Sequence, residues 1–187
     1  MQIPATQINA AGGGGFVLLE QHTAAASATL DFTSFISSTY DEYLFEMVSV
    51  TPATNSVNLG IRVGTGAGPS WASGVSDYDY VSWEYRVGGS ATGGSGGDSI
   101  LLLIRNLQIS TSNLGLNGSF RLFNPQNSAQ FVQISGKAIY VDAAGSFRIA
   151  SDFAGAYRTL NILTGVRFLY SSGNIASGTI RVYGIPK

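Results

Sequence analysis

The sequence predicts an all-β fold, a jelly-roll-like antiparallel β-sandwich, from three observations. Short apolar segments recur about every 8–14 residues, and Gly-, Ser- and Asn-rich turns separate them. Within several segments the apolar residues alternate with a period of two, as in Val57, Leu59, Ile61 and Val63. No window has a convincing helical periodicity, and no internal repeat points to a propeller or solenoid. A chain of 187 residues favours a single domain.

The sequence predicts a flexible N-terminal arm over residues 1–15 and the sandwich domain over residues 16–187. Gly12-Gly13-Gly14-Gly15 ends the arm, and four consecutive glycines cannot hold a fixed helix or strand without a large loss of entropy. We expect the arm to dock on a neighbouring subunit or capsid through Ile3, Ile8 and the four glycines, and to order only there. The alternative is a floppy terminus without a partner.

The strands are expected in segments of β-rich composition, and the remaining segments are expected to be turns. Residues 33–42 should hold at most one helical turn, and residues 88–98 should form a loop because glycine dominates them. The apolar run 100–104 suits a strand that is buried on both faces. The expected strands lie near residues 16–20, 28–32, 43–50, 57–63, 78–87, 100–104, 107–110, 118–123, 130–141, 146–150, 163–170 and 179–185.

The charge content is low and constrains the partners. Only 11% of the residues are charged, against about 25% in a typical soluble domain. This favours large contacts with other subunits, while a neutral monomer coated with Ser and Gly is the alternative. The 10 basic and 11 acidic residues are scattered without a basic run, so no nucleic-acid partner is expected.

No membrane partner or secretory signal is expected either. No apolar stretch reaches the roughly 18 residues of a membrane helix. Met1-Gln2-Ile3-Pro4 has neither the positive region nor the apolar region of a secretory signal. The chain contains no cysteine, so a disulfide or zinc–thiolate site is not available.

The residues that usually carry catalysis are sparse, and we expect neither an enzyme nor a cofactor or metal. His22 is the only histidine, and an ordinary strand-end role is favoured over that of a general base because no nucleophile motif accompanies it. Asp77 and Asp79 would share one face of a strand, as calcium ligands or glycosidase carboxylates do, but the pattern has low specificity. The glycines at 93–97 lack the Lys-Ser or Lys-Thr of a phosphate loop.

Five aromatic residues are the better functional candidates, because they gather within fifteen positions near loops. Large aromatics usually pack in cores, but they also form stacking platforms for sugar rings or flat protein contacts. A period of two places Tyr78 and Tyr80 on one face of their strand and Trp83 and Tyr85 on the other. One pair is therefore a candidate for exposure. The candidate contact residues for a glycan or a protein are Trp71, Tyr78, Tyr80, Trp83 and Tyr85.

Three segments between about residue 28 and the end of the chain carry a resemblance to a known family. The last reads as an apolar strand, the loop Ser171-Ser172-Gly173-Asn174, and a strand that finishes in Tyr183-Gly184-Ile185. The others are Val50-Thr51-Pro52-Ala53-Thr54, followed by the strand at 57–63, and the segment 118–125. The chain thereby resembles β-sandwich domains of tailed-bacteriophage virion proteins. We expect the last two strands to form a hairpin through Gly173-Asn174 that closes a sheet.

This resemblance implies a homotrimer that is displayed on a virion and assembled in the host cytoplasm. Family members serve as tail-fibre or tailspike domains, or as head decoration. The sequence has no shaft, coiled coil or repeat ahead of the sandwich, so a capsid decoration or cement protein is expected, in contact with the major capsid protein or other virion proteins. The alternative is a tail or fibre component that binds a host-surface glycan. A glycan hydrolase ranks third, and would need two exposed carboxylates about 5–10 Å apart in a groove.

Overall fold

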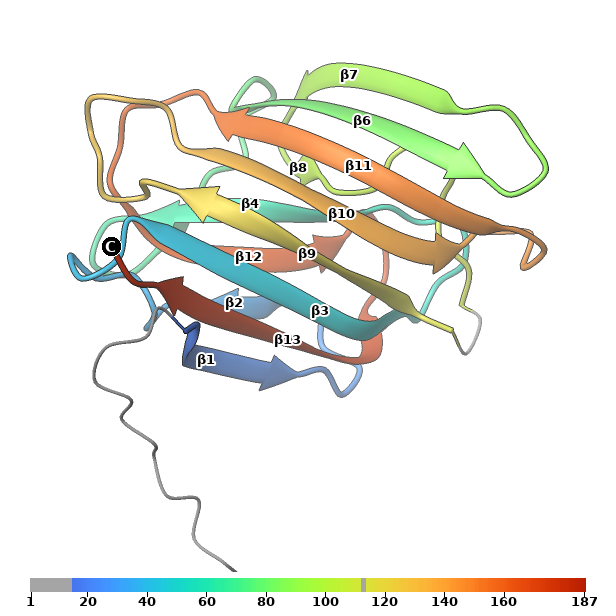
Figure 1. The fold of residues 1–187 in the computed structure, drawn as a ribbon, viewed down its shortest axis with the longest axis horizontal. Helices are drawn as coiled ribbons and strands as arrows, with labels where there is room; N and C mark the ends of the chain where they lie inside the picture. Colours follow the sequence, from blue (N-terminus) through green and yellow to red (C-terminus); the bar gives the residue numbers. More distant parts are fainter. Residues whose placement is uncertain (1–14, 112–113) are drawn as a thin grey trace, which may run out of the picture.

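The computed structural model describes residues 15–111 and 114–187, which form two antiparallel β-sheets packed face to face (Figure 1). These two ranges contain no helix, so the prediction of an all-β sandwich is confirmed, while its jelly-roll detail stays a prediction. It follows that the described residues include no helix that is long and apolar enough to cross a membrane.

Within the described residues, the larger sheet has eight strands and the smaller has five. In order across the larger sheet lie β1 (Val17–Thr23), β13 (Ile175–Ile185), β3 (Glu42–Pro52), β9 (Leu116–Phe123), β10 (Gln133–Val141), β11 (Arg148–Tyr157), β6 (Tyr78–Arg86) and β7 (Thr92–Asp98). The smaller sheet has the order β2 (Leu30–Phe32), β12 (Leu163–Tyr170), β4 (Leu59–Thr65) and β5 (Ser70–Trp71), and β8 (Leu101–Leu102) also pairs with β4.

In the long strands β3, β6 and β13, alternate residues along most of the strand lie in the core. In β13, Ile180 and Val182 are fully buried, while Arg181 between them is half-buried on the opposite face. The centre of the core is aromatic. Phe45 of β3 stacks on Phe120 of β9 with 4.8 Å between ring centroids, and it meets Phe168 of the smaller sheet at 5.6 Å. These rings join the two sheets through close-packed apolar contact.

Two buried tyrosines add polar links between the sheets. The Tyr78 hydroxyl of β6 donates to the carbonyl of Ala72 at 3.0 Å and accepts from the amide of Val63 at 2.9 Å. The Tyr170 hydroxyl of β12 donates to the carbonyl of Val50 at 3.1 Å. Burial raises the pKa of both hydroxyls far above the ordinary tyrosine value, so both remain protonated donors.

The prediction of a glycine-rich loop is wrong for residues 92–98, which form the edge strand β7. All seven residues pair with β6, from Thr92 opposite Glu84 to Asp98 opposite Tyr78. The glycines leave room for side chains of neighbouring segments. A Cβ at Gly93 would lie 2.8 Å from the Trp83 ring, and one at Gly94 would overlap the guanidinium of Arg105. The Trp83 ring therefore occupies the space above Gly93, and the Arg105 side chain occupies the space beside Gly94.

The predicted terminal hairpin is also wrong, although both of its strands exist. β12 pairs with β2 and β4 in the smaller sheet, whereas β13 lies between β1 and β3 in the larger one. The connection through Gly173, whose φ of 71° is left-handed, carries the chain from one sheet to the other. The last strand is therefore an interior strand of the larger sheet (Figure 1).

Two smaller predictions need correction. Residues 33–41 form bends and turns without the expected helical turn. Around 107–110 the structure has only isolated bridges at Ile109, which pairs with Val57 and Asp142. The run 100–104 is buried throughout as expected, but only Leu101 and Leu102 form a strand.

Candidate binding site

The outer face of the larger sheet, which points away from the smaller sheet, carries the candidate site. Strand registers place its side chains in rows that run across the strands. One row consists of Trp83, Asp152, Lys137, Ser119, Glu46, Arg181 and Gln21. The next row consists of Val81, Ala154, Ser135, Arg121, Leu44, Tyr183 and Leu18.

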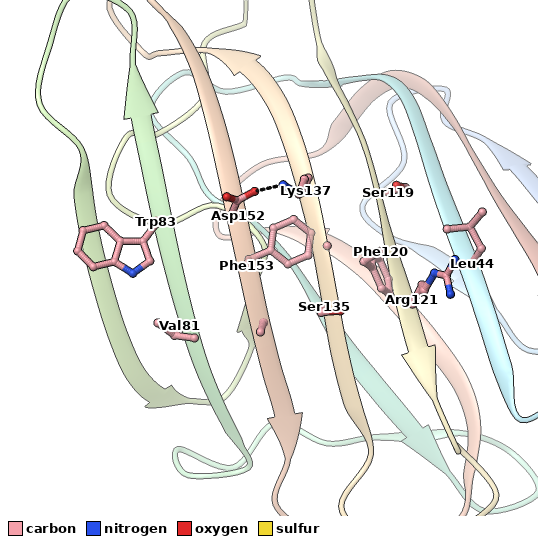
Figure 2. A pocket seen from close by; sticks show the side chains of 12 residues that line it. Leu44, Val81, Trp83, Ser119, Phe120, Arg121, Ser135, Lys137, Asp152 and Phe153 are labelled. Carbon is pink, nitrogen blue, oxygen red and sulfur yellow. Dashed lines mark ion pairs between the residues drawn. The ribbon is translucent and has the colours of Figure 1, made fainter.

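An open hollow of about 560 Å³ lies over β6, β11, β10, β9 and β3. Figure 2 shows Trp83 and Val81 along one side and Arg121 and Leu44 along the other. Short side chains lie between them, among them Ser119, Ser135 and Ala154. A second hollow of about 540 Å³ shares Val81, Ser135 and Ala154 with the first, so the two are continuous.

Trp83 is the largest exposed side chain at this hollow, with 51% of its surface accessible. A Cβ built at Gly93 would lie 2.8–2.9 Å from three atoms of the six-membered ring of the indole, Cδ2, Cε3 and Cε2. Near-equal distances to three ring atoms mean that the ring lies face-on over the Gly93 backbone. One face of the indole therefore rests on β7, and the other is free for contact.

Charged groups near Trp83 are paired with one another. The Lys137 ammonium lies 3.3 Å from an Asp152 carboxylate oxygen (Figure 2). Arg121 forms an ion pair with Glu42. Side chains of Lys137 and Asp152 are 82% and 46% exposed, so their donors and acceptors face solvent beside the hollow. The two pairs together leave no formal net charge at the hollow.

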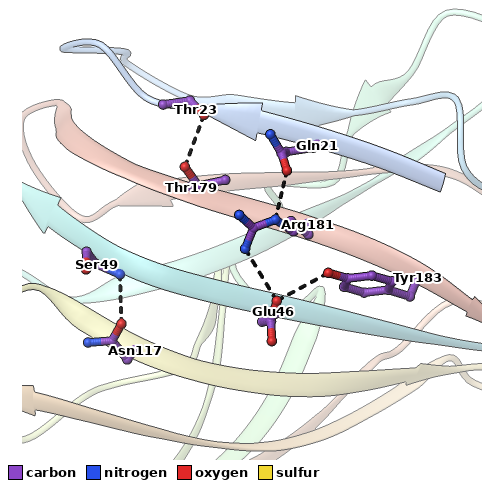
Figure 3. Close-up of polar contacts among 8 residues, drawn as sticks. All are labelled: Gln21, Thr23, Glu46, Ser49, Asn117, Thr179, Arg181 and Tyr183. Atoms are coloured by element: carbon purple, nitrogen blue, oxygen red, sulfur yellow. Dashed lines mark hydrogen bonds and ion pairs between the residues drawn. The ribbon is translucent and has the colours of Figure 1, made fainter. Parts of the chain in front are cut away.

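The other half of the outer face, over β1, β13 and β3, carries a polar network (Figure 3). Arg181 donates to Gln21 at 2.8 Å and to Glu46 at 3.5 Å, and the Tyr183 hydroxyl donates to Glu46 at 3.3 Å. Burial and the negative charge of Glu46 raise the pKa of Tyr183 above its ordinary value. The polar groups of these four side chains therefore form hydrogen bonds with one another.

An exposed apolar edge follows the predicted arm, and no pattern in the sequence indicated that it would be exposed. Phe16, Val17 and Leu18 are 55%, 44% and 52% exposed at the start of the edge strand β1. The Phe16 ring lies 6.3 Å from that of Tyr183. Of the predicted arm contacts, Gly15 is exposed beside this edge, while Ile3, Ile8 and Gly12 to Gly14 lie outside the described residues.

The five candidate aromatics do not form one cluster. Tyr78 and Tyr80 face the core and are 0% and 6% exposed, whereas Trp83 and Tyr85 are about half exposed on the outer face. The predicted division of the pairs is therefore confirmed. Tyr85 lies one row beyond Trp83 and does not line the hollow.

Trp71 lies in β5 of the smaller sheet, whereas Trp83 lies in β6 of the larger sheet. Its ring packs against the guanidinium of Arg167, 4.4 Å from the ring centroid, and Arg167 also makes a bidentate pair with Asp31 at 2.7 and 2.6 Å. Burial opposes ionisation of Asp31, but the hydrogen bonds and charge of Arg167, with smaller contributions from Thr29 and His22, keep the pKa of Asp31 below its ordinary value. Trp71 thus supports an ion pair in this sheet.

The three side chains considered as catalytic candidates, His22, Asp77 and Asp79, each contact a neighbouring residue of the fold. His22 Nε2 lies 2.7 Å from Glu20, and its ring meets Phe32 edge-on with 4.7 Å between centroids. Asp77 accepts from the Gly74 amide at 2.6 Å and closes a turn, while Asp79 pairs with Arg158 at 3.3 Å. In the parts of the chain that the structure describes, no group of three or more His, Cys, Asp or Glu residues could hold a metal ion.

The polar residues of the hollow could not be found from the sequence. Ser135, Lys137 and Asp152 are ordinary outward positions of β10 and β11, and only the strand register brings them beside Trp83. Comparison of the chain with protein-family models, curated proteins and solved structures finds no match in any of the three.

Proposed function

We propose that the chain is a structural protein of a tailed-phage virion, a homotrimeric capsid decoration protein that stabilises the head. The observation that carries this proposal is the exposed apolar edge of Phe16, Val17 and Leu18, which directly follows the predicted arm. An apolar strand edge next to an arm is a natural place for contact with another subunit. The low charge content and the resemblance to phage virion sandwiches support the same function.

The proposed mechanism is mechanical. The arm and the apolar edge hold the sandwich on the major capsid protein, and the body bridges neighbouring capsid subunits. Burying the exposed halves of Phe16 and Leu18 would contribute roughly 1 kcal/mol each. A small contribution at each copy becomes large over a particle, because a protein that binds only the assembled lattice stabilises that lattice.

Capsid occupancy tests this proposal. We expect deletion of residues 1–15, or the double change Phe16→Ser with Leu18→Ser, to reduce the amount of protein that co-purifies with capsids. Val75→Ser is the matched control, because Val75 is 83% exposed on a different loop and should be dispensable. Unchanged occupancy of both edge variants would contradict the proposal. Sedimentation of the isolated protein separates the trimer from the Ser/Gly-coated monomer.

A second candidate function is that of a tail or fibre component that binds a host-surface glycan. The specific observation in its favour is Trp83, whose free indole face borders the hollow. Electron microscopy of particles labelled at the C-terminus separates the two positions. Pro186 and Lys187 are exposed, so a label there is accessible. Label over the head supports decoration, and label on the tail supports the second candidate.

A further inference from the structure

We propose that the hollow beside Trp83 is a binding site for a neutral oligosaccharide. This inference deepens the second candidate function and rests on it for the class of ligand. The free face of the indole is the platform for one sugar ring, and the polar groups of β9, β10 and β11 bind the hydroxyls of the sugar chain. Sugar rings combine an apolar face of C–H groups with polar edges, so they need this combination of aromatic and polar groups.

The orientation of Trp83 is the first support. Gly93 lets the indole lie flat on β7, which removes one face from solvent and fixes the other. A fixed ring loses little conformational entropy when a ligand stacks on it, which is why rigid aromatics anchor many binding sites. Glycine at position 93 thus has a role beyond strand pairing.

The polar groups within reach are the second support. Ser119 and Ser135 line the hollow with hydroxyls, which both donate and accept. Asp152 supplies acceptor oxygens, while Lys137 and Arg121 supply donors. A carboxylate can accept from two adjacent hydroxyls, as vicinal sugar hydroxyls require. These groups occupy three neighbouring strands beside the indole.

Length and charge define the ligand further. Five strands, from β6 to β3, border the hollow, which corresponds to about 19 Å across the sheet. This is long enough for an oligosaccharide and not only for a single ring. Lys137 and Arg121 already have carboxylate partners, so an acidic sugar would have to displace Asp152 or Glu42. A neutral chain needs no such exchange.

Titration of the full chain with defined trisaccharides tests this site. Maltotriose, cellotriose and triacetylchitotriose are the neutral probes, and sialyllactose is the acidic one. The chain has two tryptophans, so Trp71→Phe makes Trp83 the sole indole reporter. We expect at least one neutral probe to change the Trp83 emission, and calorimetry to give this variant a Kd within about twofold of the wild type.

Two variants examine the platform. Trp83→Ala should weaken binding by about tenfold or more. Gly93→Val should also weaken it, because its Cβ would occupy the space of the indole ring. Valine suits a strand, so this variant should fold, as circular dichroism will show. Absence of binding by all neutral probes at millimolar concentration, equal binding by Trp83→Ala, or binding of sialyllactose alone would overturn the proposal.

The position of the protein on the particle is a separate question from this site. Sugar binding together with a label on the head would remove the tail position and retain the site. A label on the tail without sugar binding would retain the position and remove the site.

Discussion

Glu84 shows how much a single buried side chain contributes to this fold. Its carboxylate has no exposed surface, and it accepts hydrogen bonds from three consecutive amides. The donors are Arg105 at 2.6 Å, Asn106 at 2.9 Å and Leu107 at 2.6 Å. Charge-assisted bonds of this kind compensate the cost of burying an ionised group. Glu84 therefore fixes the segment that follows β8 against β6.

We expect Glu84→Gln to lower the free energy of unfolding by about 2–4 kcal/mol, because its amide would place a donor against backbone donors. Glu46→Gln is the matched control. Glu46 is 45% exposed and lies 3.5 Å from Arg181, so this change should cost less than about 1 kcal/mol. Urea denaturation followed by circular dichroism measures both values. Equal losses in the two variants would show that the backbone bonds of Glu84 contribute no more than a surface ion pair.

For single residues, the sequence predicted which side chains face the core and which face outward, but not which residues form hydrogen bonds with each other. The alternation of Tyr78, Tyr80, Trp83 and Tyr85 correctly indicated one buried pair and one exposed pair. By contrast, nothing local to Glu84 indicates that it accepts from amides 21–23 residues away. Partners at such distances depend on the tertiary fold, which a local pattern does not contain.

At the scale of elements, β7 explains why one strand could not be predicted. Its sequence, Thr92 to Asp98, contains four glycines and no apolar residue, so it has neither strand propensity nor alternation. It is a strand because β6 offers a complete ladder and because Trp83 and Tyr80 need space above it. The long alternating strands β3, β6 and β13 were predictable because their own residues bury one face.

We expect β7 to be the least protected strand of the larger sheet in amide hydrogen exchange. It pairs on one side only, and its glycines lose the most backbone entropy on ordering. Amides of β7 that bond to β6 should exchange at least about a hundredfold faster than those between β3 and β13. Exchange monitored by NMR gives both sets in one experiment. Comparable protection of β7 and β3 would show that side-chain cover alone stabilises this edge.

At the scale of the molecule, the larger sheet joins the two ends of the described chain. β13 pairs with β1 on one side and with β3 on the other. The sequence predicted both β12 and β13 but assigned them to one hairpin, because a short glycine-containing connection usually links paired strands. Which sheet each strand joins depends on pairings with strands more than a hundred residues away. Tyr170 of β12 pairs with Leu59 of β4, and Ile180 of β13 pairs with Met47 of β3.

We expect a chain that stops after Gly173 to lack a cooperative unfolding transition, because β1 and β3 would both lose a partner strand. Deletion of residues 1–15 should shift the Tm by less than about 2 °C, since the pairing of β1 begins at Val17. Thermal unfolding monitored by circular dichroism compares the two. A cooperative transition in the shorter chain would mean that β13 is dispensable for the sandwich.

The place of β13 also determines when this sheet can form during synthesis. Thr23 of β1 and Thr179 of β13, which contact each other, are 156 residues apart. At 5–20 residues per second, a ribosome needs about 8–30 s to make that stretch. Until β13 is made, the nascent β1, and β3 once it has been synthesised, lack the partner strand that lies between them. Open hydrogen-bonding edges of this kind are sites of misassociation between chains. A cell that makes many copies at once would therefore rely on chaperones to keep these growing chains apart.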